Sequence, residues 1–429
     1  MLALNSIVFL WGFAAARALL FFSPILLSNL LPLERYGQLE LAQSFAAIGA
    51  IVVCFGLTGT VPLIRLRDEI EGRWDTLLLL LTGLGGGCLL LALGTAIGLG
   101  TLYAVPVLVF LGIGVLMLQG LWATSLKSDG HSTRAVFVEA GFWAVAVTGA
   151  GVIVLSGNRL PIGTISFALF LYAAALLTVT LTQFRQSREG ACTLADLKRN
   201  IALGLPLMVT SVLAVVITSS GRLLLGQISG VEAVGLYAVL YRATTLPLVG
   251  HQVLTIGFFR QLFSWSDEIL RKRASVIVLG VTTMALSFWL LEPHLGWLLG
   301  QRFTETFTVY RTEGLILLVQ TILWSAIALN DLINSRLQIA GRVARKTGPY
   351  LGGGLSLLAF WAWSSAQSGN VENTLLAFVL GHFGLMVGYY TVQCWSSSRL
   401  GYRFTRLWMT VGFCTVGAAS LIFLGEIAS

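Results

Sequence analysis

Long apolar runs, separated by short polar segments, extend over almost the whole chain. Most have roughly 18 to 25 residues, enough for a helix to cross the hydrocarbon core of a bilayer. A polar segment from Arg185 to Asn200 divides them into two sets. The pattern predicts six helices before this segment and seven after it, near Ile7–Leu31, Leu41–Ile64, Thr76–Leu99, Leu102–Ala123, Ala135–Leu155, Ile162–Phe184, Ile201–Gly226, Leu236–Gly257, Ala274–Leu291, Thr312–Asn334, Tyr350–Ala366, Thr374–Cys394 and Leu407–Leu424.

One short polar sequence occurs twice between apolar runs. LPLERYGQLELAQ in the first half is matched by SGVEAVGLYAVLY in the second, so that Glu34 and Gly37 correspond to Glu232 and Gly235, 198 positions later. An even number of spans separates the copies, which indicates two halves with the same orientation. We expect each Glu-x-x-Gly sequence to form a tight turn on the outer side, because glycine tolerates positive φ.

The repeat predicts an all-α polytopic membrane protein. Two parallel six-helix bundles are expected, related by a pseudo-two-fold axis along the membrane normal and enclosing a central cleft. An extra C-terminal helix should follow the second bundle. The expected divisions are 1–184 for the N-terminal bundle, 185–200 for a cytoplasmic linker, 201–395 for the C-terminal bundle, and 396–429 for a cytoplasmic loop and the thirteenth helix.

Composition excludes a soluble protein of this length. The 429 residues are 56% hydrophobic and only 11% charged, and the mean hydropathy is +0.85. A soluble core could not bury so much apolar sequence. The first apolar run is too long for a signal-peptide core and has no basic region before it, so we expect a retained helix.

The distribution of basic residues predicts the topology. With the N-terminus in the cytoplasm, the inner loops hold 20 of the 27 lysines and arginines, whereas the outer loops hold four. This asymmetry is the positive-inside pattern, and it places the C-terminus outside if the thirteenth helix spans. Because topology explains most of the net charge of +8, no nucleic-acid partner is expected.

Three arginines remain within the apolar runs: Arg17, Arg222 and Arg242. A cation at bilayer depth is costly unless it faces protein, water or an anion, so these are candidate substrate-binding residues. Arg17 lies near mid-membrane and has no acidic partner on its own helix. Arg222 and Arg242 lie within ~10 Å of the outer end of their helices. Snorkelling to the outer headgroups is an alternative for these two.

The run from Thr312 to Asn334 carries a second polar face. Glu313, Gln320 and Asp331, together with Trp324, project to one side at helical spacing. Such a face should not contact lipid. Asp331, with Glu313 and Gln320, is a candidate coupling or gate residue, and a helix-end carboxylate near Arg336 is the alternative. His251 and His382 are expected in packing or helix–helix hydrogen bonds. The five cysteines show no spacing for a disulfide framework or metal site.

Three segments resemble a known family. LPLERYGQLELAQSFAAIGAIVVCFGLTGTVPLIR, GLPLMVTSVLAVVITSSGRLLLGQISGVEAVGLYAVLYRATTLP and INSRLQIAGRVARKT are similar to the second, the seventh and eighth, and the post-tenth-helix regions of polysaccharide flippases. These are the Wzx-type O-antigen transporters of the multidrug/oligosaccharidyl-lipid/polysaccharide (MOP) superfamily. Twelve spans are usual in that group, so a thirteenth helix departs from its pattern.

The resemblance implies a transporter rather than an enzyme. It would move an undecaprenyl-diphosphate-linked oligosaccharide, such as an O-antigen repeat unit, to the outer leaflet of the bacterial inner membrane by alternating access. Alternatives are a MATE-like drug exporter, which would favour an acidic cavity, and a flippase for a lipid-linked peptidoglycan precursor. A membrane glycosyltransferase or O-antigen polymerase is disfavoured, because the expected outer loops are short.

The expected partners follow from the same reading. They are the lipid-linked oligosaccharide, membrane lipids, and polymerase and chain-length proteins of the same pathway. No cofactor is expected, whereas coupling to a proton or sodium gradient is.

Overall fold

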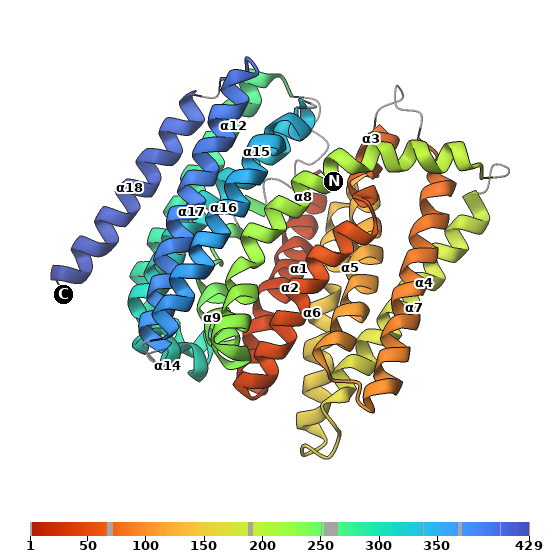
Figure 1. Ribbon diagram of the computed structural model, residues 1–429, viewed down its shortest axis with the longest axis horizontal. Helices are drawn as coiled ribbons and strands as arrows, with labels where there is room; N and C mark the ends of the chain where they lie inside the picture. Colours follow the sequence, from red (N-terminus) through yellow and green to blue (C-terminus); the bar gives the residue numbers. More distant parts are fainter. Residues whose placement is uncertain are drawn as a thin grey trace. The chain divides into compact units, whose positions relative to one another are not determined.

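The computed structural model describes residues 2–66, 72–187, 192–249, 251–252, 265–337, 339–367, 371–403 and 405–428 (Figure 1). The described residues are helical apart from short connections and contain no strand, which confirms the all-α class. They form two compact units, Met1–Val215 and Val216–Ser429. The pseudo-two-fold axis and the central cleft remain predictions.

The first unit is organised around α5. This helix packs against α2, α3, α4, α6 and α7, and α1 packs along α6 (Figure 1). The helices are α1 (Leu2–Leu30), α2 (Leu33–Val53), the 3-10 turn η1 (Leu57–Thr60), α3 (Val61–Leu66), α4 (Trp74–Leu99), α5 (Val105–Ser128), α6 (Ser132–Leu155), α7 (Gly163–Ser187) and the beginning of α8 (Leu194–Ile228).

The second expected helix, Leu41–Ile64, begins earlier than expected and is interrupted. After α2, both Phe55 and Gly56 have positive φ, 52° and 69°, and the chain continues through η1 into α3. Backbone approach at this point requires glycine, because a Cβ on Gly204 of α8 would lie 2.4 Å from the Phe55 carbonyl oxygen. The break between α2 and η1 therefore lets the backbone of α8 approach the chain at Phe55 closely.

The repeated Glu-x-x-Gly sequences are not turns. Gly37 and Gly235 lie within α2 and α9 (Gly230–Thr244), and both are buried helical residues. The chain reverses just before them, at Pro32 in the first copy and at Gly230 in the second, where φ is +84°. The expected positive φ at the repeated glycines was therefore wrong, because the helices begin earlier than their first long apolar stretch.

The segment expected as a linker is largely helical. Residues up to Ser187 continue α7 and residues from Leu194 begin α8, while 188–191 lie outside the described residues. Hydrogen bonds attach this start of α8 to the first unit: the Arg73 N–H donates to Asn200 Oδ1 at 3.3 Å, and Asn200 Nδ2 donates to the Arg73 carbonyl at 2.9 Å. Arg73 also pairs with Asp75 and Asp196. The hydrogen bond to Asp75 raises the pKa of Arg73.

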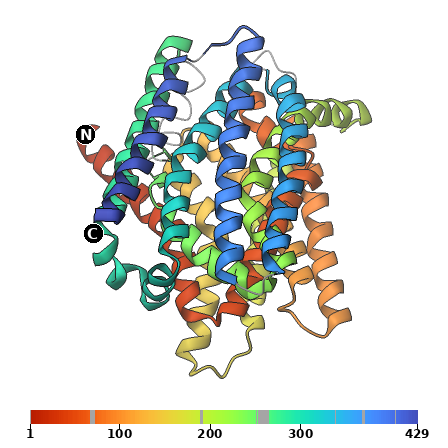
Figure 2. The ribbon, with the colours of Figure 1, turned by 60° about the vertical axis from the view of Figure 1, so that its left-hand side comes forward.

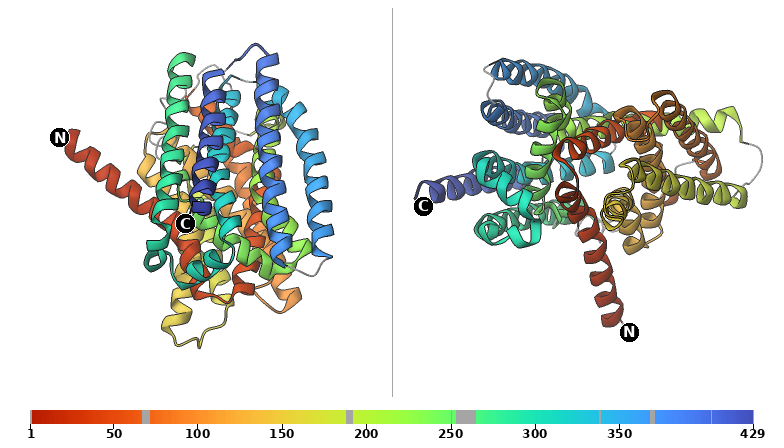
Figure 3. Two further views of the ribbon diagram at one scale, coloured as in Figure 1. Left: turned by 90° about the vertical axis from the view of Figure 1, so that its left-hand side faces the viewer. Right: turned by 90° about the horizontal axis from the view of Figure 1, so that it is seen from below.

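The second unit is organised around α15, which is mostly buried. It contacts α9, α12, α17 and α18 (Figure 2), and α18 lies alongside α12 (Figure 3). Besides the end of α8, its helices are α9, α12 (Asp267–Leu291), the 3-10 turn η2 (Glu292–His294), α13 (Gly296–Leu299), α14 (Gln301–Val309), α15 (Arg311–Arg336), α16 (Ala340–Ala366), α17 (Val371–Arg399) and α18 (Thr405–Ala428).

Most of the predicted membrane helices are found in the structure. Among the described residues, 11 helices are long and apolar enough to cross a membrane, and α18, the expected thirteenth helix, is one of them. The other two expected spans correspond to α9 and α16. Residues 250 and 253–257, at the end of the expected span Leu236–Gly257, lie outside the described residues. The longest loop expected on the outer side, about Glu292–Arg311, is not a loop, since it forms η2, α13 and α14.

Candidate functional site

A buried cluster of charges lies in the first unit, where α1, α5 and α6 meet. Arg17 of α1, only 3% exposed, forms an ion pair with Glu139 of α6 at 2.9 Å between Nη2 and Oε2. The other carboxylate oxygen, Oε1, accepts a hydrogen bond from Lys127 of α5. The Arg17 guanidinium also lies over the Phe13 ring at 5.4 Å. Arg17, Lys127 and Glu139 are called the charged triad below.

The α5–α6 hairpin positions two members of the triad. Lys127 is in the last turn of α5 and Glu139 is two turns into α6, so the long lysine side chain reaches along the hairpin to the carboxylate. Gln119 fixes their register: its Nε2 donates to the Glu139 carbonyl at 2.6 Å, and its Oε1 accepts from the Phe142 N–H at 3.2 Å. The hydrogen bonds from Gln119 thus fix the α6 backbone around Glu139, and the two cations bind its carboxylate.

Glu139 was not identified from the sequence. The helix that carries Arg17 offers no acidic partner, and Glu139 is 122 residues away along the chain. A signal was available, because Glu139 is the one acidic residue in the apolar run Ala135–Leu155. An ionisable residue inside a membrane span is a functional candidate by default. Arg17 therefore has an acidic partner, on another helix.

Arg222 and Arg242 belong to the second unit. The Arg222 side chain is buried at 4% exposure, and its guanidinium lies 5.0 Å from the Tyr241 ring centroid. Its Nη2 donates to the Thr218 carbonyl at 3.4 Å. Arg242, in the last turn of α9, is half-buried. Burial against Tyr241 argues that Arg222 does not extend into solvent, as a snorkelling residue would.

The polar face of α15 packs against α17. Gln320, 1% exposed, donates through Nε2 to the Val379 carbonyl at 3.2 Å. Its Oε1 lies 3.3 Å from Nδ1 of His382. Glu313, in the first turn of α15, is 6% exposed. As expected, this face is not presented to lipid.

Asp331 lies farther along the same face. Its Oδ1 accepts a hydrogen bond from Gln393 Nε2 of α17 at 2.6 Å. Among the described residues, it makes no ion pair with Arg336, which donates instead to the Trp265 carbonyl. The second carboxylate oxygen, Oδ2, is buried without a hydrogen-bond partner, and so is Gln393 Oε1.

Further unsatisfied polar atoms lie about one helical turn beyond Asp331 on α15 and beyond Gln393 on α17. Asn334 Nδ2 and Ser396 Oγ are buried without partners, although Asn334 Oδ1 accepts from Ser397 at 3.0 Å. Buried polar groups are normally satisfied. Four polar atoms of this stretch of the α15–α17 interface are thus unsatisfied among the described residues. Within the described residues, no group of three or more His, Cys, Asp and Glu could hold a metal ion.

His251 and His382 form hydrogen bonds between helices, as expected. His382 Nε2 lies 2.9 Å from both Ser220 Oγ and the Ile217 carbonyl oxygen of α8. His251 Nδ1 lies 3.0 Å from Ser325 Oγ of α15. His382 thus connects α8, α15 and α17 inside the second unit.

Solved structures with the same fold define the class of protein. An inward-facing multidrug resistance MATE family transporter of the MOP superfamily is 14% identical, with 92% of this chain and 96% of that chain covered and a TM-score of 0.57. An outward-facing structure of a transporter with the same description is 14% identical, with 93% and 94% covered and a TM-score of 0.54. At this identity the likeness shows the fold, which is that of MOP-superfamily transporters.

The family is shown by sequence. The family described as "Polysaccharide biosynthesis protein" matches residues 2–259, more than half of the chain. The chain therefore belongs to the polysaccharide biosynthesis protein family, and the resemblance recognised in its sequence is confirmed. Among curated proteins, none matches. The candidate membrane spans among the described residues indicate a multi-pass membrane protein.

Proposed function

We propose that the protein is a flippase for an undecaprenyl-diphosphate-linked oligosaccharide, such as an O-antigen repeat unit. The observation that carries the proposal is the charged triad inside a polysaccharide-biosynthesis family member. Arg17 and Lys127 share one carboxylate, so the triad has an excess of one positive charge. A buried excess cation attracts an anion, and the diphosphate is the anionic part of this cargo.

In this mechanism Glu139 holds the two cations until cargo arrives. The diphosphate competes with Glu139 for Arg17 and Lys127, and the arginine fork can grip two phosphate oxygens at once. Lys127 is in the last turn of α5, at the end that the charge pattern predicts to be cytoplasmic. This position suits capture of a cargo made in the cytoplasm, while its lipid tail stays in the bilayer.

Asp331 is the proposed coupling site. A proton or a sodium ion on the buried Oδ2 would neutralise a carboxylate whose hydrogen-bond partner among the described residues is Gln393. Neutralisation would change the packing of α15 against α17 and so bias alternating access. Glu313 and Gln320 lie on the same face and would respond with it. Arg222 and Arg242 would line the outward part of the cargo route.

Two other cargoes remain alternatives. A lipid-linked peptidoglycan precursor carries the same diphosphate and would use the same triad. A cationic drug suits the triad less well, because its excess charge is positive. A membrane glycosyltransferase or polymerase would need catalytic groups in an outer domain, and the outer segment Glu292–Val309 consists of short helices.

The proposed setting is the bacterial inner membrane, with the N-terminus in the cytoplasm. Polymerase and chain-length proteins of the same pathway would then receive the cargo on the outer side. A polytopic transporter that delivers a lipid-linked repeat unit leaves the later assembly steps to such partners.

Complementation of a flippase-deficient strain tests the proposal. Arg17→Ala should abolish surface glycan at normal protein abundance, since a charge-assisted contact is worth about 1.5 to 3 kcal/mol. Arg17→Lys should rescue only in part, because the bidentate grip is lost. Arg159→Ala, at an exposed arginine, is the matched control and should complement fully.

Two results would contradict the proposal. Full complementation by Arg17→Ala would remove the anion-binding role of the triad. If the wild type failed to restore surface glycan but lowered drug susceptibility in a sensitised strain, the drug-exporter alternative would replace the flippase. Arg222→Ala and Arg242→Ala should give intermediate losses if these arginines line the route.

A further inference from the structure

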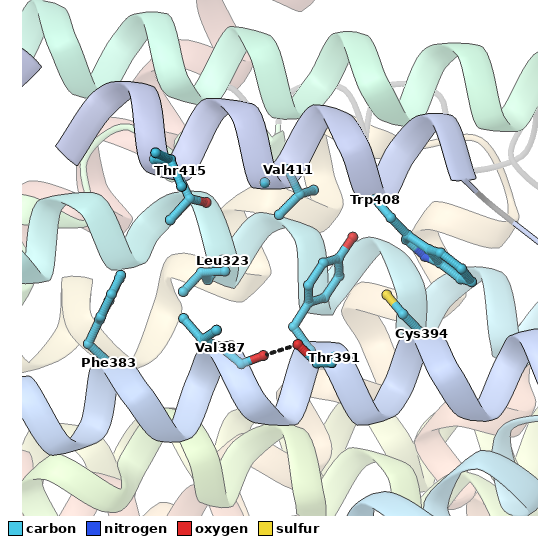
Figure 4. A pocket seen from close by; sticks show the side chains of 11 residues that line it. Leu323, Phe383, Val387, Thr391, Cys394, Trp408, Val411 and Thr415 are labelled. Atoms are coloured by element: carbon cyan, nitrogen blue, oxygen red, sulfur yellow. Dashed lines mark hydrogen bonds between the residues drawn. The ribbon is translucent and has the colours of Figure 1, made fainter. Parts of the chain in front are cut away.

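A pocket of about 430 Å³ lies in the second unit between α15, α17 and α18 (Figure 4). Trp408 and Cys394 lie at one end, and Phe383 and Thr415 at the other. Its lining is almost entirely apolar, and α18 supplies one whole wall. This volume is in the range of pockets that hold a small organic ligand. The pocket is separate from the charged triad, which belongs to the first unit.

Besides the Tyr390 hydroxyl, two polar atoms in this lining have no hydrogen-bond partner among the described residues. Thr415, 8% exposed, has an unpartnered Oγ1, and Trp408 has an unpartnered indole Nε1. Both groups can donate a hydrogen bond. Buried donors facing an apolar pocket indicate an occupant that is mostly hydrocarbon but carries oxygen acceptors, such as the ester oxygens of a lipid.

Three exposed arginines lie along the chain close to the pocket end that holds Trp408. Arg399 ends α17, and Arg403 and Arg406 belong to the connection and the first turn of α18. Arg399 lies five residues beyond Cys394, or about 8 Å along the helix axis. Arg399 also stacks on the Trp395 ring at 5.5 Å. By the charge pattern this end is cytoplasmic, where clustered basic residues beside membrane helices attract anionic lipid headgroups.

We propose that the pocket binds an anionic phospholipid of the cytoplasmic leaflet. One acyl chain fills the pocket, an ester oxygen at the end near Trp408 accepts from the indole N–H, and the phosphate contacts the arginines. With each carbon taking about as much space as a water molecule, ~30 Å³, the pocket holds roughly 14 carbons. That matches one acyl chain and is far shorter than an undecaprenyl tail. The occupant is thus a resident lipid rather than the cargo.

Glycines of α18 provide a matched pair of variants. Gly412 lines the pocket, and a Cβ added there meets no atom within 4 Å, so Gly412→Leu should fill the space without a clash. Gly417 is on the same helix, does not line the pocket, and also has nothing within 4 Å of an added Cβ. Gly417→Leu therefore makes the same chemical change outside the proposed site.

Native mass spectrometry of the purified, delipidated full-length protein tests the proposal. The probes are dioleoyl phosphatidylglycerol, dioleoyl phosphatidylcholine and undecaprenyl phosphate. Wild type and Gly417→Leu should bind one phosphatidylglycerol at least tenfold more tightly than phosphatidylcholine. Gly412→Leu should lose that binding by at least tenfold. Replacing the three arginines by glutamine should remove the preference for phosphatidylglycerol, since each basic residue near a headgroup contributes roughly fivefold.

Three outcomes would overturn the proposal. Equal phosphatidylglycerol binding by Gly412→Leu and Gly417→Leu would place the lipid elsewhere. Equal affinity for the two phospholipids in the wild type would remove the charge argument. Preferential occupation by undecaprenyl phosphate, lost in Gly412→Leu, would assign the pocket to a polyprenyl chain instead. None of these results depends on whether the protein transports a glycan.

Discussion

Glu139→Gln should destabilise the first unit, and Arg17→Met in the same chain should restore part of the loss. In the wild type, both cations of the triad bind the Glu139 carboxylate. The Glu139→Gln variant removes the one negative charge that they share. Because the Arg17 side chain is only 3% exposed, it cannot turn to water for compensation.

The magnitude follows from burial. Removing one partner of a buried ion pair costs about 3 to 5 kcal/mol. Glu139 is 25% exposed, so we expect a value near the lower end, about 3 kcal/mol. Arg17→Met alone leaves Glu139 paired with Lys127 and should cost about 1.5 kcal/mol, the value of one charge-assisted hydrogen bond.

The double variant should cost less than the sum of the two single costs. It leaves Lys127 as the remaining cation of the triad, and a lysine in the last turn of a helix can extend its ammonium towards water. We therefore expect a coupling energy of about 2 kcal/mol between Arg17 and Glu139. Unfolding by sodium dodecyl sulfate in mixed micelles, followed by circular dichroism, measures each free energy.

An exposed ion pair in the same unit is the control. Arg65 and Asp129 are 2.6 Å apart, with side chains 29% and 38% exposed. The same cycle on this pair should give less than about 1 kcal/mol. A coupling energy at Arg17–Glu139 no larger than at Arg65–Asp129 would refute the argument that burial makes the triad strong. A double variant that folds but fails to complement would show that transport needs charge in the triad and not only its stabilising effect.

Three further predictions concern other parts of the chain. Asp331→Asn keeps the bulk of the side chain but loses the charge, so it should impair complementation nearly as much as Asp331→Ala; normal transport by both variants would leave Asp331 a structural helix-end residue. Gly388→Ala should destabilise the α16–α17 contact by about 1 to 3 kcal/mol, because its Cβ would lie 1.7 Å from the Tyr350 hydroxyl. Gly384→Ala is the control, since nothing lies within 4 Å of a Cβ there, and equal unfolding free energies for the two variants would contradict the prediction. A cysteine at Arg159 should react with an impermeant reagent from outside intact cells and one at Arg345 should not, and the reverse pattern would invert the topology.

The sequence by itself determined the class of protein and the positions of most helices. Hydropathy adds up over a window of about 20 neighbouring residues, so a span is visible without any knowledge of its contacts. The polar face of α15 was predictable for a related reason. Glu313, Gln320 and Asp331 share one side at helical spacing, and polar groups at bilayer depth must face protein or water.

The tertiary structure decided which side chains meet. The sequence offered Arg336 as the neighbour of Asp331, whereas the carboxylate binds Gln393 of α17, 62 residues away. Likewise, Arg17 pairs with Glu139 of α6, which is 122 residues away. These pairings depend on the rotation and register of one helix against another, and helix packing sets both quantities outside any local window.

The local backbone conformation also depends on contacts with residues far away in the sequence. The repeated Glu-x-x-Gly sequence looked like a turn, because it interrupts the apolar pattern, yet Gly37 and Gly235 are buried helical residues. The real break, at Phe55 and Gly56, falls inside an apolar run, where no polar residue marks it. That break accompanies the close approach of Gly204 from α8. Hydrophobicity records how deeply a residue is buried, but the backbone bends where another helix requires space, and only the folded chain contains that information.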